Sequence, residues 1–193
     1  MPSDETAADH HETPKVTGAL YALLLEPGGR RFLVVDGEGG PEVPWVEAAL
    51  PYLPRVYQIN DALRERFGVE ATTLYCAHYH KDPVRHRRTG LYVMDNRSAG
   101  WSPPEGVRWA GEEVVPELRL PVEEFRPAIL QWIEEERTGQ VPALRAPWSR
   151  KGWLEGAAEW TRASVEGLGL SVTGPMEQVK HWDISTVFRV PTS

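Results

Sequence analysis

The chain has 193 residues, of which 41% are hydrophobic and 25% are charged, a composition typical of a globular protein. A formal net charge of −7 argues against a dedicated nucleic-acid or membrane surface. The single cysteine, Cys76, cannot form an intrachain disulfide, and no apolar run reaches the roughly 18 residues that span a bilayer. Because the N-terminus also lacks the pattern of a secretory signal, the sequence predicts a cytoplasmic protein without a membrane or nucleic-acid partner.

The first third of the chain alternates apolar runs with turn-forming residues. Residues 1–13 are polar and acidic, and we expect them to form a flexible tail. Two apolar runs, residues 16–25 and 31–36, flank a Pro-Gly-Gly turn, so the pattern predicts a β-hairpin. A short edge segment over residues 43–46 follows, limited by Pro44.

A helix is predicted over residues 55–67. Apolar residues recur there at helical spacing, at Val56, Ile59, Leu63 and Phe67. Gly68 follows at the position where the C-terminus of a helix favours glycine.

The remaining pattern predicts strands, two more helices and a final hairpin. The strands are expected over residues 69–80, 90–94 and 107–110, with a charged loop over residues 81–89. The later elements are a helix over 122–137, a linker over 139–152, a helix over 153–168 and a β-hairpin after residue 175.

The order of these segments resembles the Nudix hydrolase fold, and the end of the first helix resembles the second half of the Nudix box. Leu63, Glu65, Gly68 and Val69 match that box. Five other positions depart from it: Asp61 stands in place of Arg, Ala62 and Arg66 in place of two Glu, Leu53 in place of the upstream Glu and Glu47 in place of the box Gly.

The resemblance implies an α+β fold, a Nudix-like mixed sheet flanked by helices and followed by a linker helix and a C-terminal β-hairpin. Nudix catalysis holds Mg²⁺ against a diphosphate with several carboxylates on one helix face, and Mg²⁺ requires hard oxygen ligands. Glu65 alone offers too few oxygen ligands to hold Mg²⁺, so we expect no catalytic residue and no cofactor. The expected function is that of a catalytically silent binding or regulatory module of a phosphotransferase. One alternative is a divergent Mg²⁺-dependent hydrolase of a nucleoside diphosphate derivative, in which Glu47 or Glu70 joins Glu65 at the metal. Another is a structural domain that forms a homodimer through its tail strands.

A second resemblance covers residues 160–190. The run Gly174-Pro175-Met176-Glu177-Gln178-Val179, followed by Trp182, Ser185, Val187, Arg189 and Val190, is similar to the start of the kinase-like lobe in the aminoglycoside phosphotransferase family. The two resemblances together imply a Nudix-like domain over residues 14–138, a linker over 139–152 and the start of such a lobe over 153–193. A downstream kinase-like domain is then the expected partner in the intact protein. The residues that such a lobe uses for phosphoryl transfer are not in this chain, which by itself should not phosphorylate a substrate.

The candidate ligand-binding residues are basic. Arg85, Arg87 and Arg88 form the strongest basic cluster of an acidic chain, and the guanidinium fork matches phosphate oxygens. Together with Arg64 on the first helix they predict a site for a nucleotide or another phosphorylated small molecule. A solvated loop, or contact with the acidic run Glu134–Glu136, is the alternative.

Two further patterns have competing interpretations. Cys76, His78 and His80 alternate along a predicted strand and would share one side, where His86 could complete a zinc site; the alternative is a half-buried strand with polar outer residues. Trp153 and Trp160 share a face of the third helix, which predicts a helix-packing surface.

Overall fold

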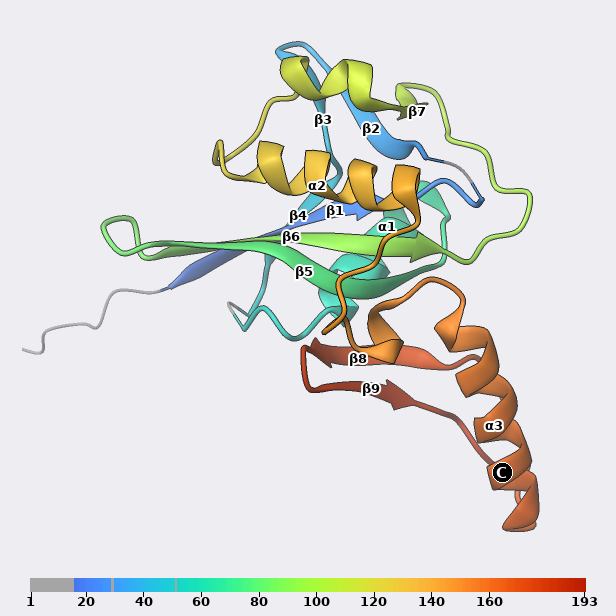
Figure 1. Ribbon diagram of the computed structural model, residues 1–193. Coiled ribbons are helices and arrows are strands. Elements are labelled where there is room, and N and C mark those ends of the chain that lie inside the picture. The colour runs from blue at the N-terminus through green and yellow to red at the C-terminus, as the bar shows by residue number, and fades with distance from the viewer. Residues whose placement is uncertain (1–15, 29, 51) are drawn as a thin grey trace, which may run out of the picture.

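A mixed four-stranded sheet lies at the centre of the molecule, between two helices (Figure 1). The computed structural model describes residues 16–193 except 29 and 51, so the expected flexible tail over residues 1–13 lies outside the described part. The strand order is β4-β1-β6-β5, with bounds Trp45–Ala48, Thr17–Leu24, Arg87–Asn96 and Ala71–Asp82. β1 runs parallel to β6 and antiparallel to β4, and β5 runs antiparallel to β6.

Helices cover both faces of this sheet, and each face has its own core. α1 (Tyr57–Phe67) packs on one face, where Ile59 and Leu63 are buried with Leu20 of β1. α2 (Phe125–Thr138) packs on the other face, where Phe125 and Trp132 are buried. Because both faces are covered, β1 is almost entirely apolar and buried rather than alternating.

A smaller antiparallel sheet completes the body beyond α2. Its strand order is β3-β2-β7, with bounds Gly40–Glu42, Phe32–Gly37 and Val107–Ala110. The expected hairpin of β1 and β2 is therefore wrong: the two strands belong to different sheets, and an isolated bridge joins Leu25 and Phe32 beside the turn. Both edges of β1 are already occupied by β4 and β6, so the chain leaves the central sheet after the turn. A short 3₁₀ helix, η1 (Glu112–Glu117), follows β7 and was not predicted.

Two predicted boundaries change at the charged loop. β5 continues to Asp82 and β6 begins at Arg87, where these two oppositely charged residues pair across the ladder, so the predicted loop shrinks to four residues, 83–86. Asp82 Oδ1 accepts hydrogen bonds from the N–H groups of Val84 and Arg85, both at 2.9 Å, which closes the turn. The helices agree better with the sequence: α1 ends at Phe67, and the following Gly68 has φ 68° and donates its N–H to Arg64 O.

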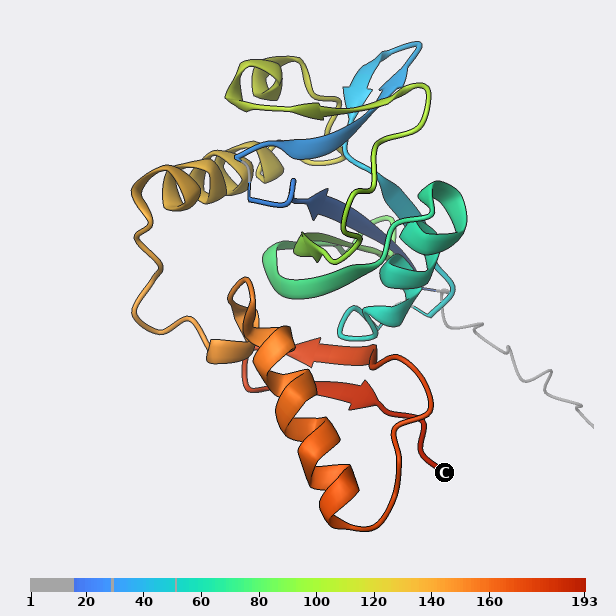
Figure 2. The same cartoon turned by 90° about the vertical axis from the view of Figure 1, so that its right-hand side faces the viewer.

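The C-terminal third lies below the central sheet. The segment after α2 packs against the body through Arg145, which lies 3.7 Å over the Tyr75 ring and 2.9 Å from the Glu135 carboxylate. It leads through the 3₁₀ helix η2 (Pro147–Ser149) to α3 (Trp153–Gly167) and then to the hairpin β8 (Glu177–Trp182) and β9 (Ser185–Arg189). β8 lies beside β5 and α1, while α3 projects from the body (Figures 1 and 2).

Only part of the tryptophan prediction holds. Trp153 packs against Phe188 of β9, with ring centroids 6.4 Å apart, but Trp160 is 72% exposed. No helix of the described part is long and apolar enough to cross a membrane.

Candidate functional site

The box-like residues at the end of α1 and directly after it divide into buried packing positions and exposed charged ones. Leu63 and Val69 are buried, and Glu65 is exposed on the helix. Arg64 binds two carboxylates, Asp61 at 2.8 Å and Glu70 at 2.9 Å. The end of α1 is thus held by an arginine-centred ion-pair cluster.

The carboxylates of the hydrolase alternative do not converge. Glu70 is engaged by Arg64, and Glu47 on β4 accepts two hydrogen bonds from Arg87, at 3.1 and 2.9 Å. Within residues 16–193, apart from 29 and 51, no group of three His, Cys, Asp or Glu side chains is placed to hold a metal ion. A Mg²⁺ site of the Nudix kind needs several oxygen ligands around one ion, whereas Glu70 and Glu47 are each paired with a different arginine.

The zinc pattern is also not assembled. The ladder of β5 has a β-bulge between Cys76 and His78, which breaks the alternation of the strand. As a result Cys76 packs against the core on the α1 face, while the His78 ring contacts Phe125 of α2 on the opposite face, with centroids 5.8 Å apart. The expectation that these residues share one side is wrong, because periodicity cannot reveal a bulge.

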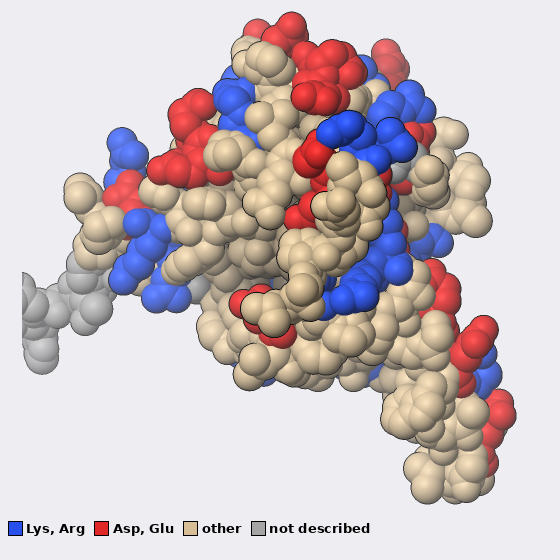
Figure 3. Space-filling view, viewed as in Figure 1, with Lys and Arg blue, Asp and Glu red and all other residues tan. Residues whose placement is uncertain are grey.

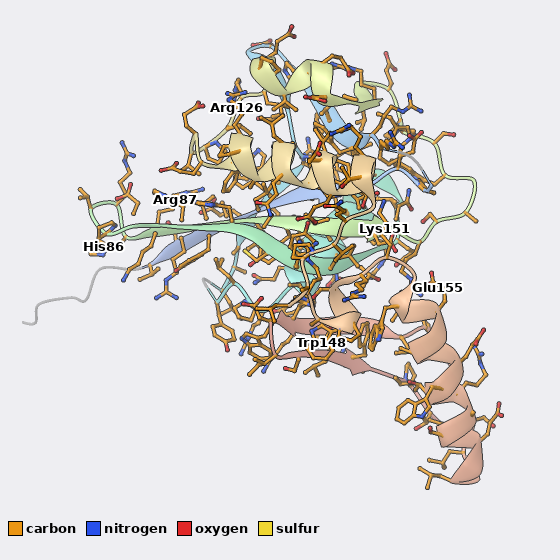
Figure 4. All side chains as sticks on the ribbon, in the orientation of Figure 1. His86, Arg87, Arg126, Trp148, Lys151 and Glu155 are labelled. Carbon is orange, nitrogen blue, oxygen red and sulfur yellow. The ribbon has the colours of Figure 1, made fainter. Side chains whose placement is uncertain are left out.

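The four predicted ligand-binding arginines are spread over the molecule. Arg85 is highly exposed and pairs with Asp82 at the tip of the β5–β6 turn, and Arg87 pairs with Glu47. Figure 3 shows basic side chains around the β5–β6 turn. In Figure 4, Arg87 lies near this turn, whereas Trp148 lies beside the C-terminal hairpin, well away from it. Arg88 lines a small hollow beside Trp182. Of the four, only Arg64 lines the cleft between α1 and the C-terminal hairpin.

That cleft has a volume of about 970 Å³ and is formed by α1, the start of β5 and the strand β8. Its basic lining residues are Arg55, Arg64, Arg97, Lys180 and Arg189, and its acidic ones are Asp61, Glu70 and Glu177. The volume is in the range of small-molecule sites. Four of the five basic residues, all except Arg64, could not be predicted as site residues from the sequence, because they come from separate segments between positions 55 and 189 and belong to no common local motif.

In the part of the chain that the structure describes, three of these cations lack an acidic partner. Arg64 is neutralised by Asp61 and Glu70, and Arg189 lies 3.4 Å from Glu177. Among the described residues, no ion pair is found for Arg55, Arg97 or Lys180. Arg55 Nε is also buried and makes no hydrogen bond. The lining of the cleft therefore has more basic than acidic residues, which favours an anion.

A buried amide, that of Gln178, lines the cleft. Gln178 Oε1 accepts from the Thr73 N–H at 2.8 Å and from Asn60 Nδ2 at 3.3 Å. Gln178 Nε2 donates to Thr73 O at 2.8 Å and to Thr186 Oγ1 at 3.2 Å. The side chain thus pairs with the backbone of Thr73 as a neighbouring strand would, at the free edge of β5.

A separate hollow of about 300 Å³ adjoins the other end of β8, beside Tyr52, Tyr79 and Trp182. Burial raises the pKa of the Cys76 thiol to about 12, with a further contribution from Asp183, so this cysteine is a poor nucleophile. Burial also lowers the pKa of His181 to about 4, against an opposing effect of Asp183, and His181 is therefore neutral at pH 7.

Comparison with solved structures places this arrangement in a known fold. The structure of a NUDIX hydrolase from Nitrosomonas europaea is 12% identical in sequence, and the alignment covers 67% of this chain and 76% of that one with a TM-score of 0.53. The chain has a Nudix-like fold. No family model and no curated protein matches the sequence.

Two other solved structures align over a similar share of this chain. The E. coli ORF135 protein is 20% identical over 67% of this chain and 95% of its own, with a TM-score of 0.48. An ADP-ribose pyrophosphatase from Streptococcus suis is 12% identical over 66% and 97%, also with a TM-score of 0.48. The predicted α+β, Nudix-like fold is confirmed, with the hairpin β8–β9 present at its C-terminal end.

Proposed function

We propose that this chain is a catalytically silent Nudix-like binding module, which holds a phosphorylated small molecule in the cleft between α1 and β8 and regulates an attached phosphotransferase. The observation that carries the proposal is the charge of the cleft, where Arg55, Arg97 and Lys180 have no acidic partner among the described residues. Phosphate oxygens complement such donors, because charge-assisted hydrogen bonds are about twice as strong as neutral ones.

The chemistry of α1 supports binding rather than turnover. A Nudix hydrolase needs carboxylates that share a metal ion, whereas here Glu70 and Glu47 are each paired with an arginine, and Glu65 projects from an exposed position. Because arginines neutralise these carboxylates, the carboxylates repel a bound anion less. The fold shared with the Nitrosomonas europaea NUDIX hydrolase supplies the helix and sheet that position these groups.

Calorimetric titration of the full chain with pyrophosphate and with ADP tests the proposal. We expect saturable binding that weakens as salt is raised, because screening reduces attraction between charged groups. Arg97→Gln should weaken binding roughly tenfold, the effect of losing one charge-assisted contact. Arg85→Gln is the matched control, since Arg85 is 82% exposed in its side chain and lies outside the cleft. Absence of binding by every phosphate compound would refute the proposal.

Incubation with nucleoside diphosphate derivatives and Mg²⁺ distinguishes a catalytically silent binding module from an active hydrolase. We expect no turnover above that of a Glu65→Gln variant. Turnover by the native chain that is lost in Glu65→Gln would establish the hydrolase alternative in its place.

A further inference from the structure

We infer that the C-terminal hairpin is half of the binding site, and that a multiply charged phosphate ligand bridges the cleft and clamps the hairpin to α1. The inference rests on the proposed function, because it concerns the same cleft. It adds that binding and docking of residues 177–189 are linked.

The two walls of the cleft come from two parts of the chain and carry the same sign of excess charge. Arg55 and Arg97 belong to the Nudix-like body and Lys180 belongs to the hairpin, and among the described residues none of the three has an acidic partner. Arg64 and Arg189 also line the cleft, but they are paired with carboxylates of their own wall. Like charges facing one another oppose docking of the hairpin when the cleft is filled only with water. An anion with charged oxygens at both ends removes this repulsion and contacts both walls at once.

The hairpin has little apolar burial of its own to hold it in place. Within β8 and β9 only Gln178 and His181 are buried, and both are polar. All the other side chains of the two strands are half-buried or exposed, Val187 at 43% among them. A two-stranded hairpin is marginal in water, so its docked state depends on contacts with the body.

The contacts that dock the hairpin are mostly hydrogen bonds. They are the three bonds of Gln178 to Asn60 and Thr73, the bond from the His181 N–H to Pro54 O at 2.9 Å, and the bond from Trp148 Nε1 to Trp182 O at 3.2 Å. An element held by few apolar contacts belongs to the less stable part of a protein and opens locally. Docking of this hairpin is therefore the equilibrium that a ligand can shift.

Linkage gives the size of the effect. A ligand that binds only the docked form multiplies the ratio of docked to open hairpin by 1 + [L]/Kd, which is about 100-fold at a ligand concentration of 100 Kd. The open and docked states differ in the position of β8–β9 and of α3, which packs on β9 through Trp153 and Phe188. Ligand binding would in this way be transmitted to the C-terminal segment, which is what a regulatory module requires.

Hydrogen exchange of the full chain, measured with and without pyrophosphate, tests the clamp. We expect the amides of β8, including the N–H of His181, to exchange up to about 100-fold more slowly at saturation. Amides of β6, at the centre of the sheet, serve as the internal reference. Orthophosphate, a smaller anion with less charge than pyrophosphate, should bind at least tenfold more weakly and give less protection of β8.

Removal of positive charge from the hairpin is a second test of the clamp. Lys180→Gln should weaken pyrophosphate binding about tenfold and reduce the protection of β8, with Arg189→Gln as a second variant at a side chain that is 70% exposed and tolerant of change. Arg85→Gln should alter neither. Pyrophosphate binding with unchanged exchange in β8 and unchanged affinity in both hairpin variants would overturn the clamp and leave the proposed function standing. Absence of pyrophosphate binding to the native chain would overturn both.

Discussion

Replacement of Gln178 by methionine tests how the C-terminal hairpin is held. Methionine keeps the length of the side chain and removes the amide that makes four hydrogen bonds with Asn60, Thr73 and Thr186. Thr73 is 0% exposed and Asn60 is 6% exposed, so water cannot replace the lost partners while the hairpin stays docked.

The magnitude follows from the groups left behind. The Thr73 N–H, the Thr73 carbonyl and Asn60 Nδ2 each lose a partner in a buried setting. An unsatisfied buried group costs about 1 kcal/mol at the lower end of its range, so the substitution should cost about 3 kcal/mol. In a chain of this size that lowers Tm by on the order of 10 °C.

Urea unfolding followed by tryptophan fluorescence measures the loss, and exchange of the Thr73 amide reports the local effect. Gln140→Met is the control, since Gln140 is exposed and lies outside the hairpin. A loss below about 0.5 kcal/mol in Gln178→Met, combined with an unchanged Thr73 amide, would show that the buried amide does not fix the hairpin.

Two further predictions concern backbone and pH. Gly68→Ala should lower the free energy of unfolding by about 1 kcal/mol, because Gly68 has φ 68°, whereas Gly156→Ala inside α3 should raise it by up to about 1 kcal/mol. An added Cβ meets nothing within 4 Å at either position, so the two free energies of unfolding, measured in urea, differ only through backbone conformation. Equal effects of the two substitutions would refute this. His181 has a folded pKa of about 4, below its ordinary value of 6.5, so the unfolded chain binds the proton more readily and stability is lost as pH falls from about 6.5 towards 4. Between pH 7 and pH 5 this amounts to about 2 kcal/mol, and His181→Phe should flatten that part of the urea-midpoint profile; an unchanged slope would contradict it.

The sequence determined the helices and most strands because their signals are local. The spacing of Ile59 and Leu63 with a following Gly68 is enough to specify α1 and its end, and the apolar face containing Phe125 and Trp132 specifies α2. The resemblance of residues 61–69 to a Nudix box indicated the fold for a similar reason, since the matching positions Leu63, Gly68 and Val69 pack or cap the helix.

Tertiary structure alone decided how these elements meet and where a ligand could bind. β1 and β2 look like a hairpin in sequence, but the covered edges of β1 send β2 into a second sheet. A bulge in β5 places Cys76 and His78 on opposite faces of the sheet. Gln178 is buried and hydrogen-bonds to the backbone of Thr73, although nothing in its local sequence distinguishes it from a surface glutamine. The positive cleft depends on tertiary packing, because Arg55 and Lys180 line the same cavity only when the hairpin docks against α1. Local periodicity carries no information about contacts between segments so far apart in the chain.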